Sequence, residues 1–295
     1  MPTETIIFDE LIEKNTPPEI EKQILSKRGF YWLEEKGLKI LVCRRLQELG
    51  FPNGFSTRLG GVSAFPEDAL NLAGFDEDSQ ENILENRRRF LDALSINFTL
   101  STVWQVHSDQ IKVINSLEQA LNGNSKADAM ISNLSEILLA IKTADCVPIL
   151  LADPKQRTFA AIHAGWRGTL ESITSKTIRK MEKIYGSTPR DLICALGPAA
   201  VSKYEVSSDV IEKFYEKFSE VAKSFFRPSQ KEGHAFLNLH QANVNQLLDS
   251  GIMKENIFVA PFCTMQRTDL FFSYRIEKAK YGKVGRLLSV IGKLN

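Results

Sequence analysis

Residues 137–170 read ILLAIKTADCVPILLAD, then PKQR, then TFAAIHAGWRGTL, and this stretch decides the fold that we expect. It contains three apolar runs, which are Ile137–Ile141, Val147–Ala152 and Phe159–Ile162. Each run is short, rich in residues that favour strands, and interrupted by proline, glycine or a charged residue. Such runs favour buried strands over one long helix. We therefore expect three buried strands around which the rest of the chain is organised.

Two reactive side chains stand at the ends of these runs. Cys146 follows the first run and His163 closes the third, and in both cases proline or glycine turns the chain soon afterwards. An earlier apolar segment, residues 103–106, leads into His107 in the same way. A strand followed by a histidine is thus expected twice, and the repetition indicates one site built from several strand ends.

Strand-like and helix-like segments mix irregularly along the rest of the chain. Phe30–Glu34 and Leu38–Cys43 flank Gly37 and predict a hairpin in which the glycine supplies a positive φ. Further strands are expected at residues 192–196 and 257–262, and further helices at residues 170–184, 209–225 and 239–250. Because no strict β-α-β rhythm is present, the pattern predicts an α+β protein and not a doubly wound sheet.

One more helix is expected after Asp78 or Ser79, either of which can cap its first turn. Its apolar positions lie at helical spacing: Ile83, Phe90, Leu91 and Leu94, together with the stem of Arg87. We expect the polar Asn86, Arg88 and Asp92 to lie on the opposite face.

Length and composition describe an ordinary globular protein. The 295 residues exceed the usual domain size, yet large sheet-containing domains reach it, so we expect one catalytic domain at residues 29–295 after an N-terminal extension at residues 1–28. The apolar fraction is 43% and the charged fraction is 25%. With 37 basic and 36 acidic side chains, the formal charge of +1 gives no electrostatic case for binding nucleic acid.

The cysteines and the N-terminus favour a reducing compartment. The four cysteines lie far apart without a C-x-x-C pair, and the first residues, MPTET, lack the basic and apolar regions of a signal peptide. We expect free thiols and a cytoplasmic location. The longest apolar run, residues 137–152, is interrupted by Lys142 and Asp145 and is too short to span a bilayer, so no membrane segment is expected.

His107, Cys146 and His163 form a set of three ligand-type residues. One thiolate and two imidazoles suit zinc with one coordination position left open, which is the catalytic arrangement. The gaps of 39 and 17 positions match no compact zinc-finger motif. For each residue alone, the ordinary alternative is a buried cysteine or a hydrogen-bonded histidine. The presence of all three at expected strand ends makes a shared site the better hypothesis.

Other residues are candidates with ordinary alternatives of their own. Arg58, beside a Gly-Gly turn, and Arg167, before a helix, are candidate phosphate or substrate ligands, although either can instead form a structural salt bridge. Asp145 and Glu205 are candidate proton carriers, although an Asp after a strand is more often a turn residue. We expect no specific role for His234 and His240.

A series of motifs, in order along the chain, resembles one known family. The motifs are FSTRLGGVS, SQENILENRRRF, WQVHSD, KADAMIS, TADCVPILLAD, AAIHAGWRG, GPAAVSKYEV and FCT followed by FFSYR. They closely resemble those of the bacterial YfiH-like family, also called the laccase-domain or polyphenol-oxidase-like family. The resemblance extends from about Phe55 to Arg275.

The resemblance implies a four-layer α/β/β/α sandwich with zinc bound by His107, Cys146 and His163. Members of this family cleave adenosine, inosine, guanosine and methylthioadenosine with phosphate to a base and a sugar 1-phosphate, and they deaminate adenosine as a second activity. This implies purine nucleosides and phosphate as the partners of a monomer or small homo-oligomer. Two family motifs depart here, since Arg275-Ile276-Glu277 replaces R-R-D and Ala199 follows the Gly-Pro pair in place of cysteine. These departures concern the rim of the substrate pocket.

Rival functions remain open from sequence. A copper oxidase needs several histidine-rich copper sites, and the chain holds four histidines, which argues against a multicopper enzyme. A cysteine hydrolase remains an alternative because a thiolate beside an imidazole is also a nucleophile. A factor that edits the cell wall (peptidoglycan) is the third alternative, and no residue pattern distinguishes it. The H-x-E…P-C-x-x-C signature of the familiar zinc deaminases is absent.

Overall fold

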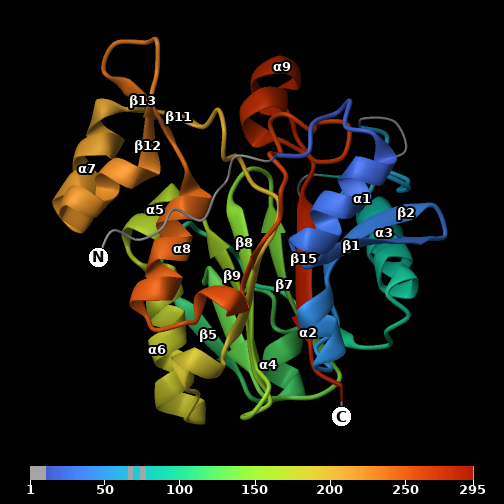
Figure 1. The fold of residues 1–295 in the computed structure, drawn as a ribbon. Coiled ribbons are helices and arrows are strands. Elements are labelled where there is room, and N and C mark those ends of the chain that lie inside the picture. Colours follow the sequence, from blue (N-terminus) through green and yellow to red (C-terminus); the bar gives the residue numbers. More distant parts are fainter. Residues whose placement is uncertain (1–10, 66–68, 74–77, 295) are drawn as a thin grey trace.

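Two six-stranded sheets packed face to face form the centre of the computed structural model, which describes residues 11–65, 69–73 and 78–294. The first sheet has the order β1 (Phe30–Glu35), β2 (Leu38–Cys43), β3 (Asn53–Ser56), β15 (Leu287–Gly292), β7 (Ile137–Thr143), β4 (Thr99–Ser101). The second has the order β14 (Ile257–Val259), β10 (Ile193–Leu196), β8 (Val147–Asp153), β9 (Thr158–Ala164), β6 (Ala129–Ser132), β5 (Ile111–Ile114). A small third sheet has the order β11 (Glu205–Ser207), β13 (His234–Leu237), β12 (Phe226–Pro228). Figure 1 shows it at the upper edge of the molecule, beside the second sheet.

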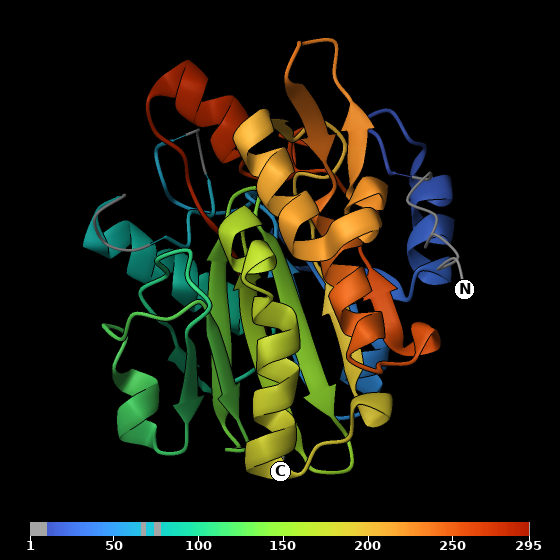
Figure 2. The same cartoon turned by 90° about the vertical axis from the view of Figure 1, so that its left-hand side faces the viewer.

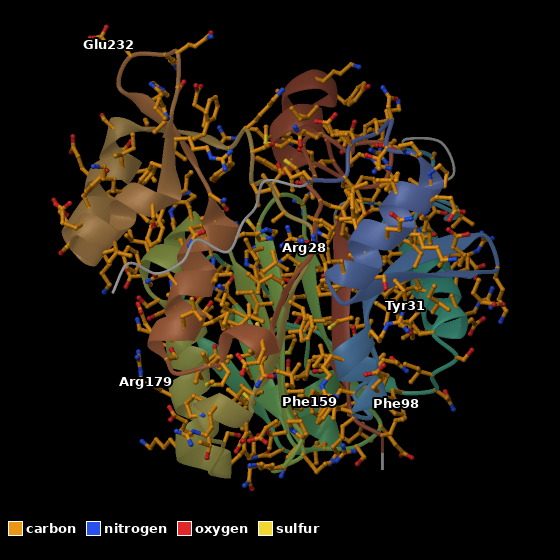
Figure 3. The ribbon with its side chains drawn as sticks, viewed as in Figure 1. Arg28, Tyr31, Phe98, Phe159, Arg179 and Glu232 are labelled. Atoms are coloured by element: carbon orange, nitrogen blue, oxygen red, sulfur yellow. The ribbon has the colours of Figure 1, made fainter. Side chains whose placement is uncertain are left out.

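The central strands are buried on both faces, which explains why their sequences are apolar without alternation. In β7, Leu139 and Ile141 face the core between the sheets, whereas Leu138 and Ala140 face a second cluster on the outside of the first sheet. Successive side chains of a strand point to opposite faces, so each face of the sheet needs its own apolar set. Phe159 of β9 lies in the core between the sheets, and Figure 3 shows it low in that core, whereas Glu232 lies at the tip of the loop between β12 and β13.

Helices cover the outward faces of the two large sheets. On the first sheet lies α3 (Gln80–Ala93), whose Phe90 and Ala93 pack against β2 and β7. On the second lie α5 (Trp166–Leu170), α6 (Ile173–Tyr185) and α8 (Leu239–Asp249), which Figures 1 and 2 show side by side. The other α-helices are α1 (Pro18–Lys27), α2 (Arg44–Glu48), α4 (Leu117–Leu121), α7 (Ser208–Phe218) and α9 (Ala279–Tyr281). Short helical turns lie at residues 189–191, 219–225 and 254–256, and a π-helix at Tyr274–Lys278.

The N-terminal segment is docked on this body as far as the structure describes it. The backbone amide of Ile12 donates to the carbonyl of Pro261 at 2.8 Å, and α1 buries Ile24 and Leu25 in the core between the sheets. The predicted boundary at residues 28 and 29 stays a prediction, and residues 1–10, with the MPTET segment, lie outside the described residues. Within the described residues, no helix is long and apolar enough to cross a membrane.

Several sequence predictions are confirmed. The protein is a mixed α+β single domain, and the three apolar runs are the strands β7, β8 and β9. The predicted hairpin is β1–β2, and Gly37 has a φ of 81°. Ser79 caps α3, because its side-chain oxygen accepts a hydrogen bond from the backbone amide of Asn82 at 3.2 Å.

One prediction about a strand was wrong. Residues 103–106 form no continuous strand, since Trp104 makes only an isolated bridge with Lys126 and His107 lies in a loop with a φ of 58°. The helix expected at residues 170–184 is confirmed as α6 from Ile173 onward, whereas Leu170 ends the separate helix α5, because Ser172 takes a left-handed conformation with a φ of 60° between the two.

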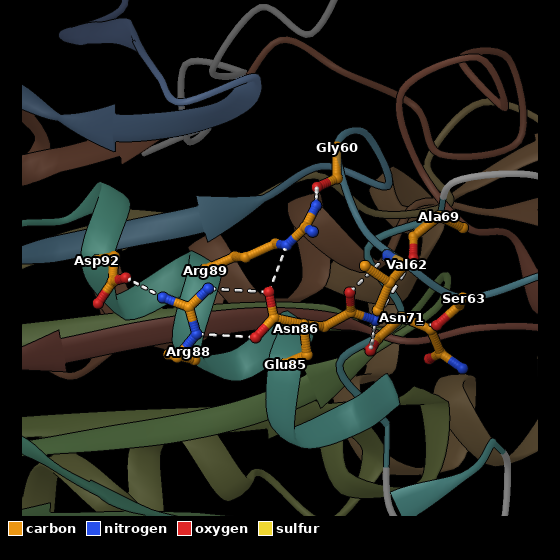
Figure 4. Close-up of polar contacts among 10 residues, drawn as sticks. All are labelled: Gly60, Val62, Ser63, Ala69, Asn71, Glu85, Asn86, Arg88, Arg89 and Asp92. Carbon is orange, nitrogen blue, oxygen red and sulfur yellow. Dashed lines mark hydrogen bonds and ion pairs between the residues drawn. The ribbon is translucent and has the colours of Figure 1, made fainter. Parts of the chain in front are cut away.

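The prediction for Asn86 was also wrong, because this residue is fully buried on the inner face of α3. Its side-chain oxygen accepts from the amide of Val62 at 2.9 Å, and its amide nitrogen donates to the Ser63 hydroxyl and the Asn71 carbonyl, both at 2.9 Å (Figure 4). The sequence pattern alone does not distinguish an asparagine that is buried by hydrogen bonds to three loop residues from one that faces solvent. Arg88 lies on the exposed side of the same helix, as expected, and it pairs with Glu85 (Figure 4).

We predict that Asn86→Ala destabilises the protein by about 2 kcal/mol or more, because truncation leaves buried polar groups of the loop without partners. The matched variant is Arg88→Ala, on the same helix, which removes exposed ion pairs to Glu85 and Asp92 and should change stability by less than about 1 kcal/mol. Chemical denaturation of both variants measures the difference. Equal effects would show that the Asn86 contacts contribute little.

Buried His240 predicts acid sensitivity of the fold. Burial lowers the pKa of His240 to about 4, although a hydrogen bond from its Nε2 to the carbonyl of Gly197 at 2.9 Å partly opposes the shift. An unfolded histidine has a pKa of about 6.5, so between pH 6.5 and 4 the unfolded chain binds a proton that the folded chain does not. His240 therefore does not lower the free energy of unfolding above pH 6.5. As the pH falls from 6.5 to 4, its protonation in the unfolded chain lowers that free energy, by roughly 3 kcal/mol at most.

We expect His240→Gln to flatten the fall in stability between pH 6.5 and 4, because glutamine keeps a donor for the Gly197 carbonyl and does not titrate. Urea denaturation of both proteins across this range, with chelator present throughout, is the measurement. Parallel curves for the two proteins would contradict the assignment.

Candidate metal centre

Cys146 lies where the chain crosses from one large sheet to the other. Strand β7 ends at Thr143 in the first sheet and β8 begins at Val147 in the second, so residues 144–146 make the crossing. Asp145 has a φ of 86°, a left-handed conformation that is uncommon outside glycine. The turn leaves the Cys146 side chain half-buried at the mouth of the sandwich.

His163 is held by Asp128, which lies immediately before β6, the neighbour of β9 in the second sheet. The His163 Nδ1 lies 2.8 Å from Asp128 Oδ1, and the His163 backbone amide donates to the Asp128 carbonyl at 2.7 Å. Because Nδ1 is engaged, Nε2 is the nitrogen left for a metal, in the carboxylate–histidine arrangement common around zinc. His163 itself is buried.

His107 comes from an exposed loop that Asp128 also shapes. The two Asp128 carboxylate oxygens accept the backbone amides of Val106, His107 and Ser108 at 3.2, 3.0 and 2.7 Å. The His107 Nε2 lies 3.9 Å from Cys146 Sγ, and the His107 and His163 rings have centroids 4.8 Å apart with planes at 82°. One buried carboxylate thus orients both histidines.

The three side chains form one compact donor set. Their ligand atoms all lie within 4.8 Å of one another, and the set runs from exposed His107 through half-buried Cys146 to buried His163, so it opens toward solvent on one side. A Cβ on Gly165 would lie 3.0 Å from His107 Cδ2 and 3.1 Å from Cys146 Sγ, so glycine leaves the room that both ligands need. Two imidazole nitrogens and one thiolate with an open side fit a catalytic zinc ion.

The electrostatics of the donor set favour the thiolate. Burial opposes ionisation of Cys146, but the charge of His163 and the hydrogen bond from His107 outweigh it and lower the pKa of the thiol to about 6. Burial likewise opposes protonation of His163, but the Cys146 thiolate and the Asp128 carboxylate raise the pKa of the imidazole to about 9. The pKa of Asp128 falls to about 2, because its hydrogen bonds outweigh its burial. The thiolate is the form that binds a metal.

A cavity of about 250 Å³ is lined by residues near the donor set along the chain, although none of His107, Cys146 and His163 is among its lining residues. Its walls come from the third sheet, α5, α7 and the π-helix, and the lining residues are Trp166, Tyr204, Glu205, Val206, Ser207, Val210, Lys231, His234 and Arg275. Two of its lining residues adjoin the ligands: Trp166 follows Gly165 directly, and the backbone amide of Arg275 donates to the carboxylate of Asp145, the residue before Cys146, at 2.7 Å. Arg275 lies 4.7 Å above the ring of Tyr204.

The other predicted site residues lie in different surroundings. Glu205 lines the cavity and hydrogen-bonds to the Ser229 hydroxyl. Arg167 is exposed and stacks 4.3 Å over the ring of Trp166. Arg58 is buried, pairs with Glu277 at 2.9 Å and donates to the Thr268 carbonyl at 2.6 Å, so its guanidinium already serves the protein interior. Asp145 is buried and accepts from three donors.

Asp128 and Arg275 are the site residues that sequence reasoning passed over. Asp128 lies in the KADAMIS motif and Arg275 closes the FFSYR motif, but sequence reasoning assigned neither residue a role. The available signal was their membership of ordered motifs, since nothing in the local pattern tells a buried carboxylate from a turn residue.

Comparison with known proteins gives concordant matches. A family model described as multi-copper polyphenol oxidoreductase laccase matches residues 52–293. A purine nucleoside phosphorylase of Staphylococcus aureus (strain COL) is 30% identical over 264 residues, covering 86% of this chain and 95% of the relative. A purine nucleoside phosphorylase of Staphylococcus saprophyticus is 31% identical over 274 residues, covering 88% and 100%.

Two solved structures match the fold. The hypothetical protein YfiH of Bacillus licheniformis has a TM-score of 0.81 at 29% identity, covering 90% of this chain and 99% of that one. YlmD of Geobacillus stearothermophilus has a TM-score of 0.80 at 28% identity, covering 89% and 98%.

We predict that Asp128→Asn weakens zinc binding by about tenfold to a hundredfold, because an amide cannot accept from both the His107 loop and the His163 ring as the carboxylate does. Competition with a chromophoric chelator measures the affinity, and circular dichroism verifies the fold. An Asp128→Asn protein that is folded and binds zinc as tightly as the parent would show that Asp128 does not organise the ligands.

Proposed function

Since the chain belongs to the multi-copper polyphenol oxidoreductase laccase family, whose members include the YfiH-like proteins, we propose that it is a zinc-dependent purine nucleoside phosphorylase. The observation that carries the proposal is the donor set of His107, Cys146 and His163, together with a cavity of about 250 Å³ lined by Trp166 and Arg275, which adjoin the residues around the ligands. The names of relatives at 30% and 31% identity support the reaction class. Adenosine, inosine, guanosine and methylthioadenosine are the proposed substrates, with adenosine deamination as a second activity.

The reaction exchanges one bond at the anomeric carbon. A phosphate oxygen forms a bond to C1′ of the ribose, the bond from C1′ to the purine nitrogen breaks with its electrons, and that nitrogen takes a proton. The products are a free base and a sugar 1-phosphate. Catalysis therefore needs a place for the phosphate dianion, a surface for the purine and a proton donor.

The donor set fits zinc better than the several copper ions of a multicopper enzyme. The chain holds four histidines, and one of them, His240 on α8, is buried and hydrogen-bonded to the carbonyl of Gly197. Two histidines and one cysteine converge here, which is enough for one ion with an open position. A zinc ion bound there would supply a Lewis acid that stabilises developing negative charge on an oxygen.

The cavity residues of this chain supply the remaining functions. Arg275 and Lys231 carry positive charge into the cavity and would hold the phosphate, with His234 beside them. Tyr204 and Trp166 present aromatic surface against which a purine can lie. Glu205 lines the same space and is the proposed proton carrier.

The two arginines predicted from sequence differ in their availability to substrate. Arg167 is exposed and stacks over the ring of Trp166, a lining residue of the cavity, and it remains a proposed phosphate ligand. Arg58 would have to leave its buried pair with Glu277 to reach a substrate, so we assign the anion to Arg275 in preference. A cytoplasmic location and a monomer or small homo-oligomer stay predictions, and the four free cysteines support a reducing compartment.

A cysteine hydrolase is the second candidate, because one observation favours it. Cys146 Sγ lies 3.9 Å from His107 Nε2 and the thiol has a pKa of about 6, which also describes an activated nucleophile. Metal removal separates the two functions, since a chelator would abolish the zinc reaction and leave a thiolate hydrolase active. A cell-wall editing factor stays an alternative, which the wall composition of a deletion strain would test.

We predict that the purified protein carries about one zinc ion per chain and releases base from nucleosides only when phosphate is present. The test incubates metal-quantified protein with adenosine, inosine, guanosine and methylthioadenosine, with and without phosphate, and resolves bases and sugar phosphates. Equal base release without phosphate, yielding free ribose, would identify a hydrolase. Stoichiometric copper without zinc would overturn the metal assignment.

We further predict that Cys146→Ala lowers phosphorolysis at least about a hundredfold while leaving the chain folded, because the sheets that form the core lie behind the ligand. The matched control is Cys194→Ala, which removes a fully buried thiol from β10 of the second sheet and should lower stability but not specific activity. Zinc content, circular dichroism and turnover are measured on the same samples. A folded Cys146→Ala protein with near-normal turnover would contradict the assignment.

A further inference from the structure

We propose that Asp145 is a positioning residue whose carboxylate fastens the C-terminal segment 273–275 to the turn that carries the metal ligand Cys146. The inference rests on the proposed metal site and deepens it, because it assigns one side chain the task of assembling the donor set and the cavity together. It replaces the role of proton carrier for this residue.

The carboxylate of Asp145 joins segments that are distant in sequence. Oδ1 accepts from the Thr264 hydroxyl at 2.7 Å, and Oδ2 accepts from the Ser273 hydroxyl at 3.1 Å and the Arg275 backbone amide at 2.7 Å. The Asp145 carbonyl accepts the amide of Ala200 at 2.8 Å. These donors come from residues 55 to 130 positions further along the chain, so the turn at Asp145 is where the later segments attach.

The backbone at Asp145 shows that the turn is held and not relaxed. A φ of 86° is unfavourable for a residue with a Cβ and persists only when the surroundings enforce it. The side chain that enforces it belongs to the same residue, through its three hydrogen bonds. Since Cys146 is the next residue, the direction of its Sγ depends on this conformation.

The same contacts explain why Asp145 is not suited to carry a proton. Both of its oxygens are occupied by protein donors and the residue is 5% exposed. Glu205, in contrast, lines the cavity. A proton carrier must reach the reacting atoms, which a carboxylate engaged on both oxygens does not do without breaking its contacts.

The fastening extends to the cavity and to the buried ion pair. The Ser273 amide donates to Glu277 at 2.8 Å, and Glu277 pairs with Arg58 at 2.9 Å, so the π-helix at Tyr274–Lys278 is anchored at both ends. The Arg275 backbone is therefore fixed by Asp145 while its guanidinium reaches the cavity over Tyr204. Arg58 has a structural role in this network.

Two substitutions separate positioning from proton transfer. In Asp145→Asn, the amide oxygen can accept from Ser273 and Arg275 while the amide nitrogen donates to the Thr264 hydroxyl, and asparagine tolerates left-handed φ better than most residues. This variant keeps the fastening but cannot transfer a proton as a carboxylic acid does. In Asp145→Gly, the left-handed backbone is unstrained but the fastening is lost.

The matched control is Asp153→Gly, at the other end of β8. Asp153 is also a fully buried aspartate that accepts two backbone amides, from Lys155 and Gln156, at 2.9 and 3.0 Å. Its loss should lower stability without changing the metal site. Circular dichroism and chemical denaturation establish that each variant is folded.

The readouts are zinc affinity by chelator competition, the absorption spectrum of the cobalt-substituted protein, and hydrogen exchange of residues 273–278. We expect Asp145→Gly to bind zinc about tenfold to a hundredfold more weakly than the parent. Its cobalt absorption bands should shift, and the backbone amides of residues 273–278 should exchange their hydrogens faster. Asp145→Asn should stay within about threefold of the parent in zinc affinity and turnover, and Asp153→Gly should resemble the parent in all three readouts.

An Asp145→Gly protein with parental zinc affinity, cobalt spectrum and hydrogen exchange would overturn the proposal. Full zinc binding by Asp145→Asn together with loss of turnover would restore the proton carrier and also overturn it. Failure of the proposed phosphorolysis is a separate outcome, since the metal and exchange readouts do not require turnover. A parent protein that binds no zinc would reject the metal site itself, and this inference with it.

Discussion

The passage of one chain segment from the first large sheet to the second is the constraint on which the site depends. Strands β7 and β8 are consecutive in sequence but belong to different sheets, so the three residues between them must cross the mouth of the sandwich. Both strands are buried on each face, and neither can shift without exposing apolar side chains that contribute roughly 25 cal/mol per Å² of buried area. The crossing, and Cys146 within it, is therefore held by the core of the whole protein.

Two buried carboxylates position the metal-ligand side chains around this crossing. Asp128 approaches from the side of the histidines and orients both the ring of His163 and the loop of His107. Asp145 approaches from the side of the cysteine and joins its turn to the C-terminal segment. Neither carboxylate is one of the three metal-ligand side chains. Each acts by positioning a residue that is one of them. The cavity follows from the same arrangement, because the segment held by Asp145 carries Arg275 into its wall.

The sequence allowed the strands and the ligand types to be predicted, because both depend on local pattern. The runs at residues 137–141, 147–152 and 159–162 are apolar throughout since both faces are buried, and such runs are readable without tertiary information. The identity of the ligands followed from residue chemistry and from the family motifs. Their convergence within 4.8 Å is present in the structure and was not derivable from gaps of 39 and 17 positions.

The errors share one cause, which is that tertiary contacts overrode a local pattern. His107 was placed at a strand end, whereas Asp128 holds it in a loop. Asn86 was placed on a polar helix face, but its side chain is buried by its hydrogen bonds to the loop residues Val62, Ser63 and Asn71. The substrate role predicted for Arg58 is a different case: its guanidinium pairs with Glu277, 219 positions away, and the role stays a prediction. The most direct measurement of the central claim is zinc K-edge X-ray absorption of the purified protein. The account predicts two nitrogen scatterers at about 2.0–2.1 Å, one sulfur at about 2.3 Å and one further light atom, and a spectrum without sulfur would contradict it.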